Sequence, residues 1–129
     1  MILVLKTDSP EAMIALYEDG SCVDTMIWHA HKELSSTLLG KIDELLLARN
    51  VQKNDLTGIV VFKGPGSFTG LRIGITVANT LAYSLQIPIV GSEGEDWIAE
   101  GLQKITESQK TEIIIPLYGS EAHITQPRK

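Results

Sequence analysis

The chain has 129 residues and a mass of 14.1 kDa, with 43% hydrophobic and 21% charged residues, which suits one globular domain with a core. Its net charge of −5 disfavours a nucleic-acid-binding surface of its own, and a single cysteine excludes an internal disulfide framework. No apolar run is long enough to cross a bilayer, and Ile2 to Leu5 is too short for the core of a signal peptide. We therefore expect a cytoplasmic protein without membrane contacts.

The first part of the chain predicts three antiparallel strands. Ile2 to Leu5 is a continuous apolar run, which is typical of a central strand buried on both faces. Two further strands are expected over Ala12 to Tyr17 and Cys22 to His29, because Asp19-Gly20 between them is a strong hairpin signal. This arrangement also opens the actin-like ATPase and RNase H-like folds.

Two helices and two strands are expected next. Leucine and isoleucine recur at helical spacing from Lys32 to Arg49, which predicts an amphipathic helix whose apolar face is widened by Leu47. Gly58 to Phe62 predicts a strand, Leu71 to Leu85 a helix, and Ile87 to Gly91 a strand whose proline indicates a sheet edge or a strand start. The order β-β-β-α-β-α-β predicts an α/β protein with a mixed five-stranded sheet, as in the actin-like ATPase and RNase H-like folds.

The last part of the chain gives weaker signals. Trp97 to Ile105 predicts a short helix, Thr111 to Leu117 is β-branched and apolar, and Ala122 to Thr125 can pair back on it as a hairpin. We therefore expect one domain over residues 1–105 and a short hairpin-like extension with a polar tail over residues 106–129. The polar ending favours a naturally short protein over a truncated one.

The most informative stretch joins the predicted fourth strand to the second helix. Its glycines and proline predict a rigid turn, in which Ser67 or Thr69 can cap the first helical amides. Such a turn either binds an anion at the helix N-terminus or is a structural corner only. It is not a Walker A loop, because no Gly-Lys-Ser/Thr ending is present. This signature turn consists of Gly64, Pro65, Gly66, Ser67, Phe68, Thr69 and Gly70.

The second helix carries small residues at i, i+4 spacing, namely Gly70, Gly74, Ala78 and Ala82. This row predicts a groove with almost no side chain along one helix face. Each interior glycine costs about 1 kcal/mol relative to alanine, so another element must approach closely. The spacing leaves two candidates, which are the chain's own sheet or helix and a helix of another protein.

These segments resemble a known family. The run from Gly64 to Gly74 is similar to the signature of the bacterial TsaB family, also called YeaZ. The opening strand and its Thr7-Asp8-Ser9 turn, the helix over Ser35 to Leu46, and the strand over Ile87 to Ser92 resemble the corresponding parts of that family. Lys6 departs from the pattern, because the family has an aspartate there.

The resemblance implies a non-catalytic scaffold subunit of the complex that makes N6-threonylcarbamoyladenosine in tRNA. It implies a heterodimer with the catalytic TsaD subunit, a TsaE-type ATPase as a further partner, homodimers in isolation, and tRNA met only through the complex. It implies no cofactor, metal or catalytic residue in this chain. In that family the two helices make the subunit contact. Carried over by position, the resemblance implies these contact residues: Leu38, Leu39, Ile42, Leu46, Gly70, Arg72, Gly74, Val77, Ala78 and Leu81. Spacing does not decide which of these face outward.

Two other function classes stay open. The first is an actin-like nucleotide-binding or phosphotransfer enzyme, and the second, which the residues support less, is an RNase H-like nuclease or a peptidase. Lys6 puts a cation where such enzymes hold a metal or phosphate, and Asp8 and Glu11 are expected to be solvated turn residues. No Ser/His/Asp set is apparent.

The remaining candidates are single residues. His29 and His31 can share a strand face, but a third metal ligand is not evident because His123 is distant in sequence. Cys22 is expected to be a small core residue. Arg72 opposes the helix dipole near the start of the second helix, which indicates either a carboxylate on a partner or simple exposure.

Overall fold

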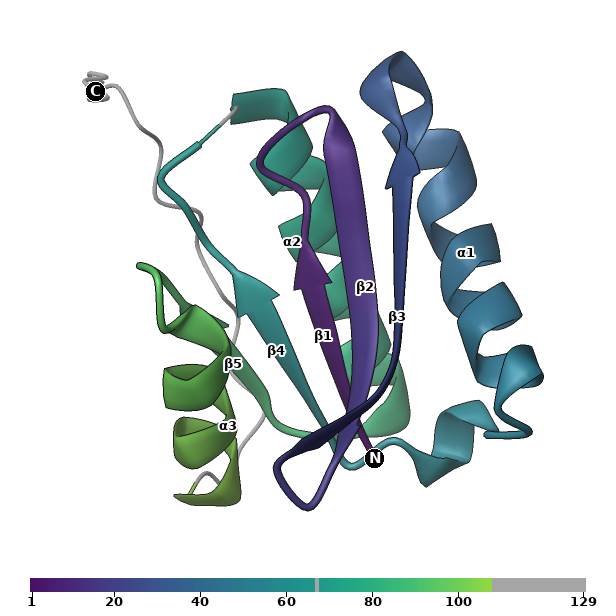
Figure 1. Cartoon of the computed structure of the whole chain (residues 1–129), viewed down its shortest axis with the longest axis vertical. Helices are drawn as coiled ribbons and strands as arrows, with labels where there is room; N and C mark the ends of the chain where they lie inside the picture. The colour runs from purple at the N-terminus through teal and green to yellow at the C-terminus, as the bar shows by residue number, and fades with distance from the viewer. Residues whose placement is uncertain (67, 108–129) are drawn as a thin grey trace.

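The computed structural model describes residues 1–66 and 68–107. Five strands and three longer helices form one sheet with helices on both faces (Figure 1). They are β1 (Ile2–Lys6), β2 (Glu11–Glu18), β3 (Ser21–His29), α1 (Leu34–Ala48), β4 (Gly58–Phe62), α2 (Phe68–Leu85), β5 (Ile89–Ser92) and α3 (Trp97–Glu107). The predicted mixed actin-like sheet is therefore confirmed.

The strand order is β3-β2-β1-β4-β5. Strands β1, β2 and β3 pair antiparallel, whereas β4 pairs parallel to β1 and β5 parallel to β4. The continuous apolar run of β1 lies at the centre of the sheet, where both faces are covered, and its residues Leu3, Val4 and Leu5 are fully buried. Strand β5 is an edge strand and begins directly after Pro88, which agrees with the predicted edge or strand start.

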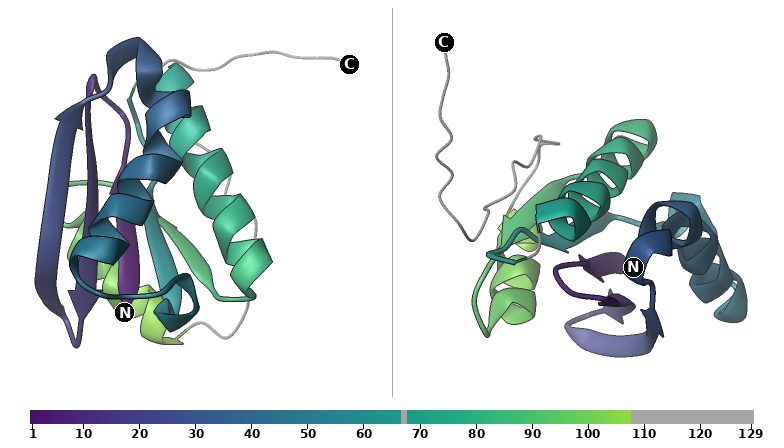
Figure 2. Two further views of the ribbon diagram at one scale, coloured as in Figure 1. Left: turned by 90° about the vertical axis from the view of Figure 1, so that its right-hand side faces the viewer. Right: turned by 90° about the horizontal axis from the view of Figure 1, so that it is seen from above.

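Helices α1 and α2 lie side by side on one face of the sheet, and α3 lies on the other (Figure 2). Alternate residues of β4 point to α3, because an added Cβ on Gly58 would meet Ile105 and the Phe62 ring packs edge-on against Trp97. Helix α3 also lies close to β4 at Gly101, where an added Cβ would lie 2.3 Å from a methyl group of Val60.

The main core lies between the sheet and the α1–α2 layer. Its largest fully buried side chains include Leu3, Leu5, Ile14, Leu16, Leu38, Ile42, Leu45, Ile59 and Leu71. Each such side chain contributes about 1.5–3 kcal/mol when it leaves water. The indole N–H of Trp28 in β3 donates a hydrogen bond to the hydroxyl of Thr37 in α1 at 3.2 Å, which fixes α1 against the edge of the sheet.

The element boundaries differ from the prediction in a few places. Helix α2 begins at Phe68, three residues early, and β5 begins at Ile89, two residues late. Short 3-10 helices, which the sequence patterns did not predict, occupy His31–Glu33 and Lys53–Asp55. The predicted widening of the α1 apolar face was wrong, because Leu47 is 80% exposed.

Helix α3 runs to Glu107, just past the expected domain end at residue 105. The hairpin expected beyond it, over Thr111 to Leu117 and Ala122 to Thr125, lies outside the described residues. Among the helices that the structure describes, none is long and apolar enough to cross a membrane.

Candidate functional site

The signature turn links the end of β4 to the start of α2, as predicted. Gly64 has a φ of 116°, in the left-handed region that favours glycine, and the Gly64–Pro65 bond is cis. Before the turn, Lys63 pairs with Glu93 at 3.6 Å, which joins the ends of β4 and β5. Ser67 lies outside the described residues, so its predicted role as a helix cap stays a prediction.

The end of β1 packs directly against this turn. The Lys6 ammonium pairs with the Asp8 carboxylate and lies 4.7 Å from the centroid of the Phe62 ring. An added Cβ on Gly66 would lie 2.5 Å from the Asp8 Cβ, so the turn backbone rests on Asp8. Asp8 is therefore a packed and paired residue, and the expectation of a solvated turn carboxylate was wrong for it. Glu11 is exposed, as expected, but it is the first residue of β2 and not part of the turn.

The row of small residues on α2 faces the sheet. An added Cβ on Gly74 would lie 2.1 Å from the Thr7 hydroxyl oxygen, and Ala78 and Ala82 are fully buried. The buried Thr7 hydroxyl also donates to the Gly70 carbonyl at 2.8 Å. Of the two candidates that spacing left open, the chain's own sheet fills this groove.

Six of the ten predicted interface residues consequently belong to the core. They are Leu38, Ile42, Leu46, Gly74, Ala78 and Leu81, all buried within the chain. These six residues are not accessible to a partner in this structure, because the i, i+4 pattern identifies a packed face without naming what packs on it. The other four remain accessible, with Leu39 50% exposed, Arg72 exposed, and Gly70 and Val77 half-buried.

The outward face of the helix pair has a different composition from that row. We define the α1–α2 surface as ten exposed residues of the two helices, namely Ser36, Leu39, Gly40, Asp43 and Leu47 of α1 and Thr69, Arg72, Thr76, Thr80 and Tyr83 of α2. Their spacing follows one face of each helix. Leu47 and Tyr83 are 80% and 74% exposed. Two of these ten residues, Asp43 and Arg72, are charged, and the exposed Glu44 of α1 lies outside the set.

A groove runs between the two helices beside this surface. It has a volume of about 420 Å³ and is lined by Ser35, Thr69, Arg72, Ile73, Thr76 and Val77. Sequence reasoning named only Arg72 and Val77 of these as interface residues. The signal that could have found the rest is the near absence of charge in α2, whose 18 residues include one charged side chain, Arg72.

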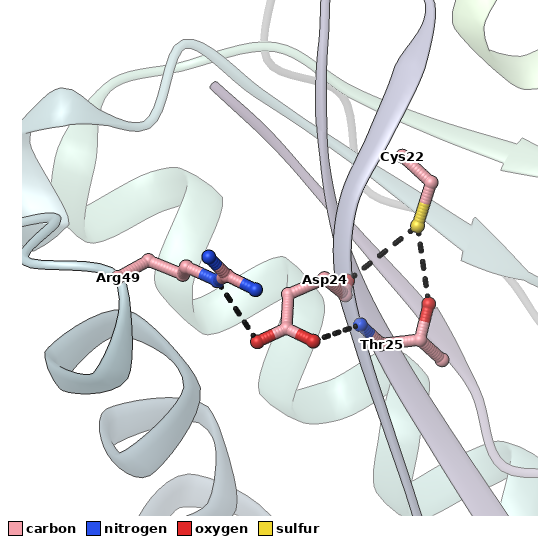
Figure 3. Close-up of polar contacts among 4 residues, drawn as sticks. All are labelled: Cys22, Asp24, Thr25 and Arg49. Carbon is pink, nitrogen blue, oxygen red and sulfur yellow. Dashed lines mark hydrogen bonds and ion pairs between the residues drawn. The ribbon is translucent and has the colours of Figure 1, made fainter.

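Cys22 is exposed, so the expectation that it lies in the core was wrong. Its thiol contacts the Thr25 hydroxyl at 3.1 Å and the Asp24 carbonyl at 3.7 Å (Figure 3). Burial raises the pKa of the nearby Tyr17 phenol, and Cys22 adds to that shift. None of these contacts assembles a nucleophile with a base.

The part of the chain that the structure describes contains no set of side chains that could bind a metal ion. Within residues 1–66 and 68–107, no group of three His, Cys, Asp or Glu side chains could hold a metal ion. His29 is exposed near the end of β3, and His123 lies outside the described residues.

Comparisons with known proteins agree with the fold. The profile of TsaD, tRNA N6-adenosine threonylcarbamoyltransferase, matches residues 28–110. The tRNA threonylcarbamoyladenosine biosynthesis protein TsaB of Bacillus subtilis is 41% identical over 88 residues, which cover 68% of this chain and 38% of that protein. The TsaB protein of Escherichia coli is 30% identical over 100 residues, covering 78% and 43% of the two chains.

Solved structures show the same likeness. YeaZ from Pseudomonas aeruginosa superposes with a TM-score of 0.64 at 29% identity, covering 71% of this chain and 42% of that one. A second Pseudomonas aeruginosa structure, described as an uncharacterized protein similar to peptidase YEAZ, gives a TM-score of 0.68 at 28% identity, covering 84% and 48%.

The fold and the matched profile make this chain an actin-like protein related to the tRNA N6-adenosine threonylcarbamoyltransferases. More narrowly, the chain belongs to the TsaB family, also called YeaZ. It spans less than half the length of the two TsaB relatives described above.

Proposed function

We propose that this chain is a non-catalytic accessory subunit in tRNA threonylcarbamoyladenosine biosynthesis, and that it binds a TsaD-type catalytic subunit through the α1–α2 surface. The observation that carries the proposal is the low charge of that exposed surface, which presents Leu39, Leu47 and Tyr83 to solvent. The pathway itself comes from the TsaB relatives, which are named as tRNA threonylcarbamoyladenosine biosynthesis proteins.

The composition of the surface is typical of a protein–protein contact. Such contacts are depleted of charged residues at their centre and enriched in aromatic residues and arginine. On α2 the exposed side chains that the structure describes are three threonines, Ser84, Tyr83 and Arg72, in place of the lysines and glutamates usual on a solvated helix face. The Thr80 hydroxyl donates to the Thr76 carbonyl at 2.8 Å, so this side chain already has a partner within its own helix. Covering this hydroxyl therefore costs less desolvation energy than covering an unpaired one.

The choice of a TsaD-type partner rests on the shared helix pair. The TsaD profile matches residues 28–110, which include both α1 and α2. A TsaD-type subunit is therefore expected to carry a similar helix pair, and two such pairs can pack as a helical bundle around an approximate two-fold axis. The same geometry allows homodimers of this chain when the partner is absent.

We propose no catalysis by this chain alone, because its signature turn and strand ends present no arranged nucleophile, base or metal ligands within the described residues. The complex would hold the tRNA mainly through another subunit, since this chain has a net charge of −5. A TsaE-type ATPase as a further member of the complex and a cytoplasmic location are part of the same proposal.

The test is complex formation with the TsaD-type subunit of the same organism, measured by size-exclusion chromatography and by titration. Leu39→Asp puts a charge beside the groove and is expected to weaken binding by about tenfold or more. Ile27→Asp is the matched control, because Ile27 is an apolar residue 61% exposed on the opposite face of the sheet. That placement follows from its register with Met13 and Lys6, whose ammonium contacts Phe62 on the α3 side.

The two variants separate the possible outcomes. If Leu39→Asp weakens the complex and Ile27→Asp does not, the α1–α2 surface is the contact. If the unchanged chain forms no complex, or if the two variants bind alike, the proposed interface is wrong. An assay of tRNA modification with and without the chain then tests the accessory role itself.

A further inference from the structure

We infer that Lys6 is a positioning residue for the α1–α2 surface, because its ion pair with Asp8 holds the signature turn and hence the start of α2. This inference rests on the proposed function for its biological meaning, although the structural coupling can be measured without a partner. Lys6 lies on the opposite face of β1 from α2, so its effect must pass through Asp8.

The Lys6–Asp8 pair is more sheltered than an ordinary surface ion pair. The side chains of Lys6 and Asp8 are 32% and 18% exposed. The Lys6 ammonium also lies over the Phe62 ring, and Phe62 is packed edge-on against Trp97 of α3. Partial burial lowers the effective dielectric, so this pair fixes the position of Asp8 more firmly than a fully solvated pair would.

Asp8 in turn supports the turn backbone. The position of an added Cβ on Gly66 would lie 2.5 Å from the Asp8 Cβ and 3.3 Å from its carbonyl oxygen, so the turn has no room to settle toward β1. The intervening residue, Thr7, reaches the other side of the strand, where its hydroxyl holds the Gly70 carbonyl and packs on Gly74. Asp8 and Thr7 thus contact the turn at Gly66 and the first part of α2 at Gly70 and Gly74, while Lys6 contacts Asp8 and Phe62 of β4.

The start of α2 supplies much of the groove beside the α1–α2 surface. Thr69, Arg72 and Ile73 lie in its first turns and face Ser35 of α1 across the groove. Because packed helices shift as units, a displaced turn moves these side chains together relative to α1. A looser turn therefore lowers affinity by leaving the surface less preorganised, even though Lys6 touches no partner.

The experiment is a double-mutant cycle on the pair. Lys6→Met keeps the apolar stem over Phe62 and removes the charge, and Asp8→Asn keeps the side-chain shape against Gly66. Each single variant is expected to bind the TsaD-type subunit about fivefold more weakly, and the double variant no more weakly than either single variant. Lys6→Arg should restore most of the affinity, because it restores the cation.

Lys63→Met is the matched control, since Lys63 forms a similar lysine–carboxylate pair with Glu93 at the same end of the sheet. It is expected to leave affinity within about twofold of the unchanged chain. The second readout is amide hydrogen exchange over residues 69–76, which should speed up in Lys6→Met and not in Lys63→Met.

Unchanged affinity together with unchanged exchange in Lys6→Met would overturn the inference, as would equal effects of Lys6→Met and Lys63→Met. A failure of the proposed function looks different. In that case the unchanged chain binds no TsaD-type subunit, while the exchange rates over residues 69–76 still decide whether Lys6 holds the turn.

Discussion

At the scale of single residues, Asp24 ties the exposed edge strand β3 to the end of α1 (Figure 3). Its carboxylate accepts a hydrogen bond from Arg49 Nε at 3.0 Å and another from the Thr25 backbone N–H at 2.9 Å. The Arg49 hydrogen bond, followed by the Thr25 N–H, holds the pKa of the Asp24 carboxyl below its usual value. Sequence reasoning missed this pair, because the two residues are 25 positions apart and neither belongs to a motif.

This pair predicts an acid-dependent loss of stability. The folded-state pKa of Asp24 lies below the unfolded value, so the pair stabilises the fold at pH values above about 4. Its contribution is lost as the pH falls through the depressed pKa, because the native state must then take up a proton. We expect Asp24→Asn to be less stable than the unchanged chain at neutral pH and to approach it in acid. Urea unfolding at several pH values measures this, and a constant difference at all pH values would contradict it.

Arg49→Gln provides the control for that experiment. It removes the first cause of the pKa shift and leaves the carboxyl in place. We therefore expect Arg49→Gln to show the same narrowing difference toward low pH, although a smaller one, because the Thr25 N–H still stabilises the carboxylate.

At the scale of elements, periodicity predicted the type and order of every strand and of the three longer helices within the described residues. Period-two and period-3.6 patterns depend on local geometry, which the sequence carries directly. The direction of the small-residue row was not predictable in the same way. Gly74 requires a close neighbour, but only the folded sheet shows that this neighbour is Thr7 and not a second protein.

The Gly74–Thr7 contact makes a prediction about the helix–sheet interface. Gly74→Ala would put a methyl group 2.1 Å from the Thr7 hydroxyl oxygen and 3.1 Å from its Cβ. The Thr7 side chain or α2 must then shift, so we expect a loss of about 1–3 kcal/mol in the free energy of unfolding. Gly40→Ala is the matched control, because a Cβ there meets nothing within 4 Å on the outer side of α1. It should raise the free energy of unfolding by about 0.5–1 kcal/mol.

The free energies of unfolding of both variants, measured by chemical denaturation, decide whether the small-residue row of α2 is packed against the sheet or open. Equal effects of the two alanine substitutions would mean that Gly74 has free space, and the row would again be available to a partner. A Gly74→Leu variant is unsuited to probing an interface with a partner, because the larger side chain would disturb the contact between α2 and β1 within the chain.

At the scale of the whole molecule, the fold was more predictable than the candidate surface. The family signature pointed to the helix pair α1–α2 as the subunit contact, which stays a prediction, and six of the ten positions carried over are buried. Exposure depends on how the two helices rotate against the sheet, and Leu39 at 50% exposed differs from its neighbour Leu38 at 0% by one step along the helix. Such a rotation is a property of the assembled core.

The arrangement of strand ends separates the accessory role from the alternative of a nucleotide-binding enzyme. Open α/β sheets bind ligands at the carboxyl ends of their parallel strands. At that end of β1 and β4, Lys6 and Lys63 each pair with a carboxylate, Asp8 and Glu93 respectively. A nucleotide phosphate would have to displace these carboxylates before either lysine could bind it, which opposes binding.

We therefore expect the melting temperature of the chain to be the same with and without Mg-ATP. A site with a Kd of about 50 µM would be stabilised by about 2.7 kcal/mol at about 5 mM nucleotide, which raises the melting temperature of a domain of this size by several degrees. Magnesium chloride alone and sodium ATP alone are the controls for ionic effects. A rise that requires both magnesium and ATP, and that Lys6→Met alters, would favour the nucleotide-binding alternative, because the strand ends would then hold phosphate and the lysine pairs would be part of a ligand site.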